Sequence, residues 1–161
     1  MKKLFITAAI ATMFSVTAFA KGGNKTTTVK TGEDKISYTV LNEFNAEFKD
    51  AKNAAWTVTP NCEKVTFTLE GKKLTAFYDG AGTYLGLTQA IEYKDIPYSA
   101  QEEINAKYAG YAVKEVIKYV GEDTGLEVSP VAYFVDLKNE KKEFLVKAVD
   151  GENVEFFKTI K

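Results

Sequence analysis

The residue types that this chain lacks limit the chemistry it could perform. Its 161 residues contain no histidine, the side chain that most often serves as general base, catalytic-triad member and metal ligand. Ser37, Ser99 and Ser129 therefore have no histidine to activate them. None of the three has a lysine three residues later, as the S-x-x-K motif of serine–lysine catalysis requires. The sequence predicts no catalytic residues, and the protein is not expected to be an enzyme.

Two turns and the pair Glu102–Glu103 are the acidic segments that could be read as metal-binding or acid–base sites. Segments 79–82 (DGAG) and 150–153 (DGEN) resemble calcium-binding loops. However, Ca²⁺ takes six or more oxygen ligands, and the first segment offers a single carboxylate. Hairpin turns explain both segments, because glycine tolerates the positive φ of such turns. Glu102 and Glu103 would point about 100° apart on a helix, and Glu102 fits a capping box opened by Ser99. No metal and no cofactor is expected.

The cysteine content excludes an intramolecular disulfide, and the basic residues argue against a nucleic-acid partner. Cys62 is the only cysteine, so no intramolecular disulfide can form. All 21 basic residues are lysine and 22 residues are acidic. Nucleic-acid-binding proteins usually carry a basic stripe in which arginine reaches bases and phosphates. A nucleic-acid partner is therefore not expected.

The first 20 residues predict a cleavable signal peptide. Lys2 and Lys3 precede an apolar run over residues 4–19, which closes on the A-F-A sequence of residues 18–20, with small residues where a signal peptidase reads. The run is shorter than the roughly 20 apolar residues of a spanning helix, and no later segment is as apolar. We expect a periplasmic or secreted protein with no membrane span after cleavage. Residues 21–35, polar and rich in glycine and threonine, predict a flexible leader.

The periodicity of apolar residues then predicts one helix followed by four strands. Apolar residues within 40–51 fall on one helix face. After Asn53 the period changes to two, with alternating segments near 56–59, 65–69, 74–78 and 83–89. Turn sequences separate these segments, which indicates antiparallel strands.

The second half repeats this order. A helix is expected over 98–108, followed by strands near 112–120, 131–137, 142–149 and 154–160. The helix positions correspond at an offset of 60 and the Asp-Gly turns at an offset of 71. We therefore predict an α+β fold with two tandem α-β-β-β-β repeats, residues 36–90 and 91–161. They would form an antiparallel sheet with helices packed on one face.

These segments also resemble a known family. The helix-to-strand entry FNAEFKDAKNAAW, the hairpins KVTFTLEGKKLTAFYDGAGTYLGLTQ and the second entry IEYKDIPYSAQEEINAKYAGYAVKEVIKY are similar to the PepSY-like, β-lactamase-inhibitor-like proteins exported by Gram-negative bacteria. The resemblance covers nearly all of residues 36–161. It implies tandem α+β repeats and a non-enzymatic, protein-binding or inhibitory role. One departure is that the inhibitor whose name the family borrowed uses disulfides, which this chain cannot form.

Strand alternation places a set of large apolar residues on the sheet face away from the helices. In the expected register, the outer face carries threonine and lysine together with Phe77, Tyr84, Phe134, Leu145 and Phe157. The face that meets the helices carries Trp56, Val58, Val65, Phe67, Leu69, Leu74, Ala76, Tyr78, Leu85 and Leu87 in the first repeat, and Tyr133, Val135, Leu137, Phe144, Val146, Val154 and Phe156 in the second. Exposed aromatic residues on a rigid polar sheet are typical of protein-recognition surfaces. The alternative is that these residues are scattered surface apolars, or that the leader or the 121–130 loop covers them.

Together these observations predict a non-enzymatic binding module of the cell envelope. It would dock a protein or peptide, with inhibition as one outcome, on the open face of its sheet. A carrier or sensor for a small ligand is the alternative, and a pocket of several hundred Å³ would favour it.

Overall fold

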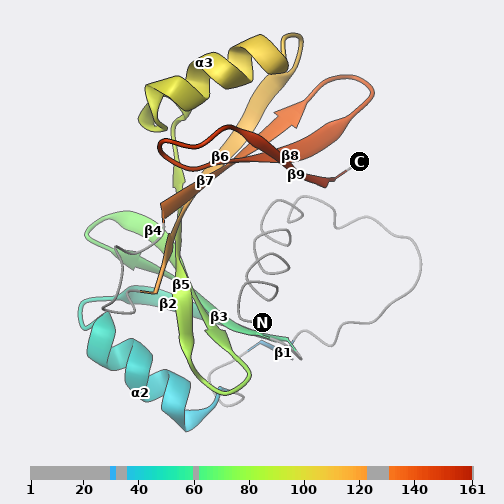
Figure 1. Cartoon of the computed structure of the whole chain (residues 1–161). Coiled ribbons are helices and arrows are strands. Elements are labelled where there is room, and N and C mark those ends of the chain that lie inside the picture. Colours follow the sequence, from blue (N-terminus) through green and yellow to red (C-terminus); the bar gives the residue numbers. More distant parts are fainter. Residues whose placement is uncertain (1–29, 32–35, 60–61, 123–130, 161) are drawn as a thin grey trace. The chain divides into compact units, whose positions relative to one another are not determined.

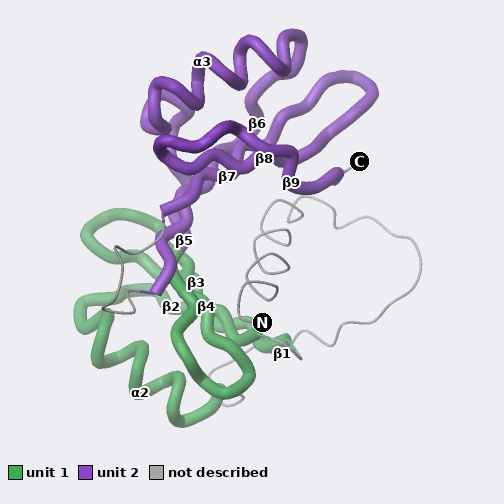
Figure 2. The backbone as a smooth tube through the Cα atoms, in the orientation of Figure 1, with its two compact units in different colours: residues 1–87 green, residues 88–161 purple. Residues whose placement is uncertain are grey.

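The computed structural model describes residues 30–31, 36–59, 62–122 and 131–160 (Figure 1). The chain divides into two compact units, residues 1–87 and 88–161 (Figure 2). The expected signal peptide, nearly all of the expected leader, and residues 123–130 of the second-repeat loop lie outside the described residues.

The described part of unit 1 contains a helix and antiparallel strands in chain order. The helix is α2 (Tyr38–Glu47), and the strands are β1 (Lys30–Thr31), β2 (Lys52–Thr59), β3 (Cys62–Leu69) and β4 (Lys72–Asp79). β5 (Tyr84–Ile91) carries the chain from unit 1 into unit 2. Each of the strands β1 to β4 pairs with the next in antiparallel orientation. α2 begins after Ser37, whose hydroxyl accepts a hydrogen bond from the Val40 N–H at 3.4 Å.

The core of unit 1 lies between α2 and one face of its strands. Rings dominate this core: Phe44 contacts Trp56 and Phe67 edge to face, with centroids 5.2 and 5.1 Å apart. Its buried members are Val40, Phe44, Phe48, Trp56, Val65, Phe67, Leu74, Ala76 and Tyr78. The strand positions among them are those that the alternation assigned to the helix side.

Unit 2 has the same kinds of elements. A 3₁₀ turn, η2 (Tyr93–Asp95), precedes the helix α3 (Tyr98–Lys107), and four antiparallel strands follow: β6 (Ala112–Gly121), β7 (Val131–Lys138), β8 (Glu143–Ala148) and β9 (Glu155–Thr159). The helix-side core contains Ile96, Ala100, Ile104, Val116, Val135, Leu137, Phe144, Val146, Ala148 and Val154. Antiparallel strands with two helices confirm the α+β class.

Two local details test the turn and cap predictions. The β3–β4 turn places Glu70 and Gly71 at φ 50° and 77°, the left-handed backbone of a tight hairpin. The capping box at Ser99 is wrong: α3 begins at Tyr98 after Pro97, with no side-chain cap. Pro97 occupies the cap position, so Ser99 is already inside the helix, and the Gln101 amide instead donates to the Ile96 carbonyl at 2.9 Å.

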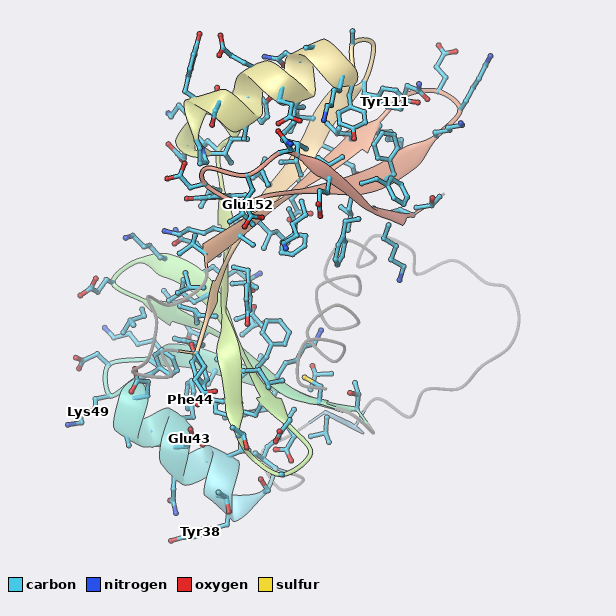
Figure 3. The ribbon with its side chains drawn as sticks, viewed as in Figure 1. Tyr38, Glu43, Phe44, Lys49, Tyr111 and Glu152 are labelled. Atoms are coloured by element: carbon cyan, nitrogen blue, oxygen red, sulfur yellow. The ribbon has the colours of Figure 1, made fainter. Side chains whose placement is uncertain are left out.

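The contrast between two aromatic residues of α2 gives a stability prediction. Phe44 points into the core and is 4% exposed, whereas Tyr38 points away from the helix and is 80% exposed (Figure 3). Phe44→Ala should lower the free energy of unfolding by about 3–5 kcal/mol because it leaves a cavity among rings. Tyr38→Ala should change it by less than about 0.5 kcal/mol. Urea unfolding followed by the emission of Trp56, the only tryptophan, measures both. Equal losses for the two variants would contradict this core.

Candidate binding site

The predicted outer-face residues do not form an exposed surface. Phe77, Phe134 and Leu145 do lie on the face away from the helix, but they are only 3%, 4% and 0% exposed. Phe157 is half-buried, and its ring packs edge to face on Phe134, with centroids 4.8 Å apart. The expectation of exposure is wrong because alternation assigns a side chain to a face without showing whether that face meets solvent. The binding role of these residues stays a prediction.

Tyr84 lies on the other side of the sheet from the one expected. Its ring packs against Tyr78 and Phe48, with centroids 5.6 and 6.3 Å apart, and it joins the helix-side core of unit 1. The expected register therefore fails at the start of β5, where Tyr84 follows a turn. In that turn the Asp79 carboxylate accepts hydrogen bonds from Ala81 N and Thr83 N, each at 2.9 Å.

Unit 2 has an aromatic hollow on the helix side of its described strands. It has a volume of about 380 Å³ and is lined by Tyr108, Tyr111, Lys142, Glu143, Phe144, Phe156 and Thr159. Three ring pairs meet at Phe144: Tyr111 at 4.9 Å, Tyr108 at 5.4 Å and Phe156 at 5.9 Å between centroids. Phe156 is 58% exposed. Below, "the hollow" means this set of seven residues.

The end of α3 supplies two of these rings. Tyr108 caps the helix by donating its N–H to the Ile104 carbonyl at 2.9 Å. The Tyr111 N–H in turn donates a hydrogen bond to the Tyr108 carbonyl at 3.1 Å. Gly110, at φ 88°, gives the turn the left-handed backbone that it needs. This turn places Tyr108 and Tyr111 on the same side of Phe144's strand (Tyr111 is labelled in Figure 3).

A bulge in β9 supplies the opposite wall. Leu145 pairs with Lys158 and Val146 pairs with Phe156, so β9 contains one extra residue, Phe157. In a regular strand, residues three apart point to opposite faces. The extra residue lets Phe156 and Thr159 line the same hollow, an effect for which bulges are known.

An ion-pair network lies on the face of the strands away from α3 and engages Glu143, the one acidic residue that lines the hollow. Glu143, 5% exposed, receives Lys114 Nζ on one carboxylate oxygen at 2.6 Å and Lys138 Nζ on the other at 3.1 Å. The hydrogen bond from Lys114 is the main reason that the pKa of Glu143 is lowered and that of Lys114 is raised. Lys114 reaches this place because it is the extra residue of a second bulge, in β6. The negative charge of the Glu143 carboxylate is thus neutralised by two lysines.

Asp136 is the least satisfied member of this network. Lys114 Nζ lies 3.4 Å from one carboxylate oxygen, yet among the described residues neither oxygen receives a hydrogen bond, and the residue is 0% exposed. Burial raises the pKa of Asp136, and repulsion by Glu143 adds to the rise, while Lys114 lowers it in part. The protonated form of Asp136 is therefore favoured by folding.

Lys142 carries the remaining charge of the hollow. It lies one residue before the start of β8 and lines the hollow. It is exposed, and within the described part of the chain its ammonium group forms no ion pair. The side chains that line the hollow thus combine four rings, the Thr159 hydroxyl and one unpaired positive charge.

The lining of the hollow offers groups suited to binding. The tyrosine and threonine hydroxyls donate or accept hydrogen bonds, and the rings offer apolar contact. Over residues 36–59, 62–122 and 131–160, no three His, Cys, Asp or Glu side chains gather as metal ligands would. Cys62 lies in unit 1, and burial raises the pKa of its thiol to about 11, so it stays protonated at neutral pH.

The sequence analysis missed the hollow for identifiable reasons. Phe156 was assigned to the core because it shares the phase of Phe144, but it lies on the last strand of the sheet and is largely exposed. Tyr108 was considered only as a helix residue, and no role was predicted for Tyr111. The one available signal was the spacing of two tyrosines around Gly110 at a helix end.

Comparison with known proteins shows the fold. No family model matches the chain, and no curated protein matches it. A DUF2874 family protein from Bacteroides uniformis has a TM-score of 0.67 at 12% identity, over 78% of this chain and 90% of that one. A BLIP-like protein from Bacteroides fragilis scores 0.63 at 12% identity, over 77% and 86%. A candidate periplasmic protein from Bacteroides eggerthii scores 0.66 at 9% identity, over 77% and 88%.

At these identities the likeness establishes a shared BLIP-like fold and nothing finer. The β-lactamase-inhibitor-like part of the resemblance seen in the sequence is thereby supported at the level of fold. Nothing in these likenesses supports the PepSY-like part.

The raised pKa of Asp136 gives a pH prediction. Between its unfolded and folded pKa values, the folded state holds a proton that the unfolded state has lost, so stability falls as pH rises through this window. The window lies above the ordinary aspartate pKa of about 4. Asp136→Asn removes this effect, so its free energy of unfolding should rise relative to wild type as pH increases from 4. Urea unfolding from pH 4 to 8 measures the difference.

The matched control is Asp150→Asn, which changes an exposed aspartate in a turn of the same unit. Its unfolding curve should run parallel to that of wild type across this range. A parallel curve for Asp136→Asn as well would show that the Asp136 carboxyl titrates normally.

Proposed function

We propose that this chain is an exported, non-enzymatic binding module that holds a protein or peptide segment in the aromatic hollow of unit 2. The observation that carries the proposal is the exposure of Phe156, at 58%, on the wall of an opening whose other rings are packed in place. A large apolar ring held beside solvent is costly unless another surface covers it, and pre-positioned aromatic rings are the usual anchors of protein interfaces.

The docking surface in this proposal differs from the open sheet face expected from the sequence. The face that carries Phe134 and Leu145 is buried, whereas the hollow faces solvent through Phe156 and Thr159. The lack of histidine and the engagement of Glu143 by two lysines support a binding role over a catalytic one. The BLIP-like protein among the structural neighbours agrees with an inhibitory form of docking.

The proposal includes two tandem α-β-β-β-β repeats, over residues 36–90 and 91–161. Its support is a bulge at the same place in each. In β2, one extra residue lies between the pairs Lys52–Thr68 and Ala55–Thr66. In β6, one lies between Val113–Leu137 and Glu115–Asp136. Bulges are specific features of a strand, and the positions that follow them, 55 and 115, are separated by the same offset of 60 as the helices.

Export to the periplasm or beyond is the second part of the proposal. The signal-peptide pattern of residues 1–20 supports it, as does the candidate periplasmic protein among the structural neighbours. Among the described residues, no helix is long and apolar enough to cross a membrane. The proposed partner is therefore a protein or peptide of the cell envelope or outside it.

A small-ligand carrier is the second candidate function. The hollow's volume of about 380 Å³ lies at the lower end of the range of small-molecule sites, about 300–1,000 Å³. Its walls are mainly aromatic with few polar groups, as such sites are. The two functions would use the same residues and are separated by what the protein captures.

Crosslinking capture tests the proposal. Protein beginning at Lys21 is incubated with cell-envelope extract of the source organism, beside Phe156→Ala and, as matched control, Tyr98→Ala, which removes a 72%-exposed tyrosine of the same unit outside the hollow. A partner should be captured by wild type and Tyr98→Ala and lost, or reduced at least tenfold, with Phe156→Ala.

Capture of the same protein by all three variants would place docking elsewhere. If none captures a protein and native mass spectrometry finds a bound small molecule that Phe156→Ala loses, the carrier function replaces the proposed one.

A further inference from the structure

The charge balance of the hollow indicates the chemistry of its occupant. Glu143, the only acidic member, is engaged by Lys114 and Lys138 on its two carboxylate oxygens. On the nearby helix α3, Lys107 is paired with Glu103. Among the described residues that line the hollow, Lys142 thus keeps the only uncompensated charge, and it is positive.

The position of β9 indicates an extended occupant. The order of hydrogen-bonded strands ends at β9, so no described strand pairs with its outer edge. Four of its five residues are exposed, including Phe156 and Thr159, which line the hollow. A peptide laid along a free strand edge gains main-chain hydrogen bonds and presents alternate side chains to pockets on one face.

The chain's own leader lacks the features that would suit this place. Residues 21–35 (KGGNKTTTVKTGEDK) contain four lysines against two acidic residues, Glu33 and Asp34, and no aromatic residue. Their lysines would be repelled by Lys142, and they have no ring to fill the hollow. A foreign segment with an aromatic residue and a negative charge matches both features.

We propose that the hollow and the free edge of β9 recognise an extended segment of a partner protein in which an aromatic residue is next to an acidic one. The aromatic ring enters among Tyr111, Phe144 and Phe156, and the neighbouring carboxylate approaches Lys142. The inference rests on the function proposed above and specifies the partner's chemistry. The apolar contact supplies most of the affinity, and the charge supplies selectivity, because exposed ion pairs are weak.

Defined peptides test this pairing. Fluorescein-labelled six-residue peptides share a glycine–threonine frame and carry, at the centre, Asp-Phe, Asn-Phe, Lys-Phe or Asp-Ala. Fluorescence anisotropy gives Kd for wild type at low salt. Asp-Phe should bind about two- to fivefold more tightly than Asn-Phe, the size expected for one exposed ion pair, and Lys-Phe more weakly than either. Asp-Ala should lose at least tenfold, and the Asp-Phe preference should shrink at 1 M salt.

Variants then assign the preference to its residue. Lys142→Glu should reverse the order, so that Lys-Phe binds more tightly than Asp-Phe. Lys141→Glu is the matched control: it places the same charge one position earlier on the hairpin, outside the hollow, and should keep the order of wild type. Phe156→Ala should weaken all phenylalanine peptides together.

Three other outcomes would overturn part or all of the proposal. If all phenylalanine peptides bind equally, before and after Lys142→Glu, while Phe156→Ala weakens them, the acidic specificity is wrong and the proposed function stands. If Phe156→Ala changes nothing, the hollow is not the binding site, and both the peptide specificity and the proposed function are wrong. If no peptide binds but free N-acetylphenylalanine does, the occupant is a small ligand and the peptide inference is overturned.

Discussion

The helices α2 and α3 have ten residues each, whereas the strands β2 to β5 and β7 have eight, and the difference in length limits how much of the sheet face each helix covers. A helix of ten residues is about 15 Å long, whereas an eight-residue strand spans about 27 Å. The helix cannot cover the whole sheet face, so side chains beyond its end must cover the rest. In unit 1 the rings of Phe48, Trp56, Tyr78 and Tyr84 pack together there. In unit 2 the corresponding region is the hollow around Phe144.

Two bulges shape the surroundings of this opening. The bulge of β9 brings Phe156 and Thr159 to the same side, and the bulge of β6 brings Lys114 to Asp136 and Glu143. The first helps to shape the hollow, and the second places Lys114 against Glu143 and Asp136 on the opposite face of the strands, where it helps to neutralise Glu143. Neither contribution requires catalytic chemistry. Both are consistent with a rigid surface that selects a partner by shape and charge.

The sequence allowed the α+β class, the order of elements and most of the helix-side core to be predicted, because periods of 3.6 and two are strong signals. It failed where one residue changes the geometry. Tyr84 lies directly after a turn, and its side of the sheet depends on how that turn ends. Phe156 has the phase of a core residue, yet it is exposed because it lies on the last strand. Phe77, Phe134 and Leu145 were placed on the correct face, but their burial depends on tertiary packing that strand alternation does not encode.

The central claim is that an aromatic side chain of a partner occupies the hollow, and intermolecular nuclear Overhauser effects test it most directly. Protein beginning at Lys21 would be labelled with ¹³C and mixed with the unlabelled Asp-Phe peptide. The account predicts contacts from the peptide ring to Tyr111, Phe144 and Phe156, with none to Trp56 in the core of unit 1. Contacts to Phe134 and Phe157 instead would place the partner on the opposite face of the sheet and contradict the account.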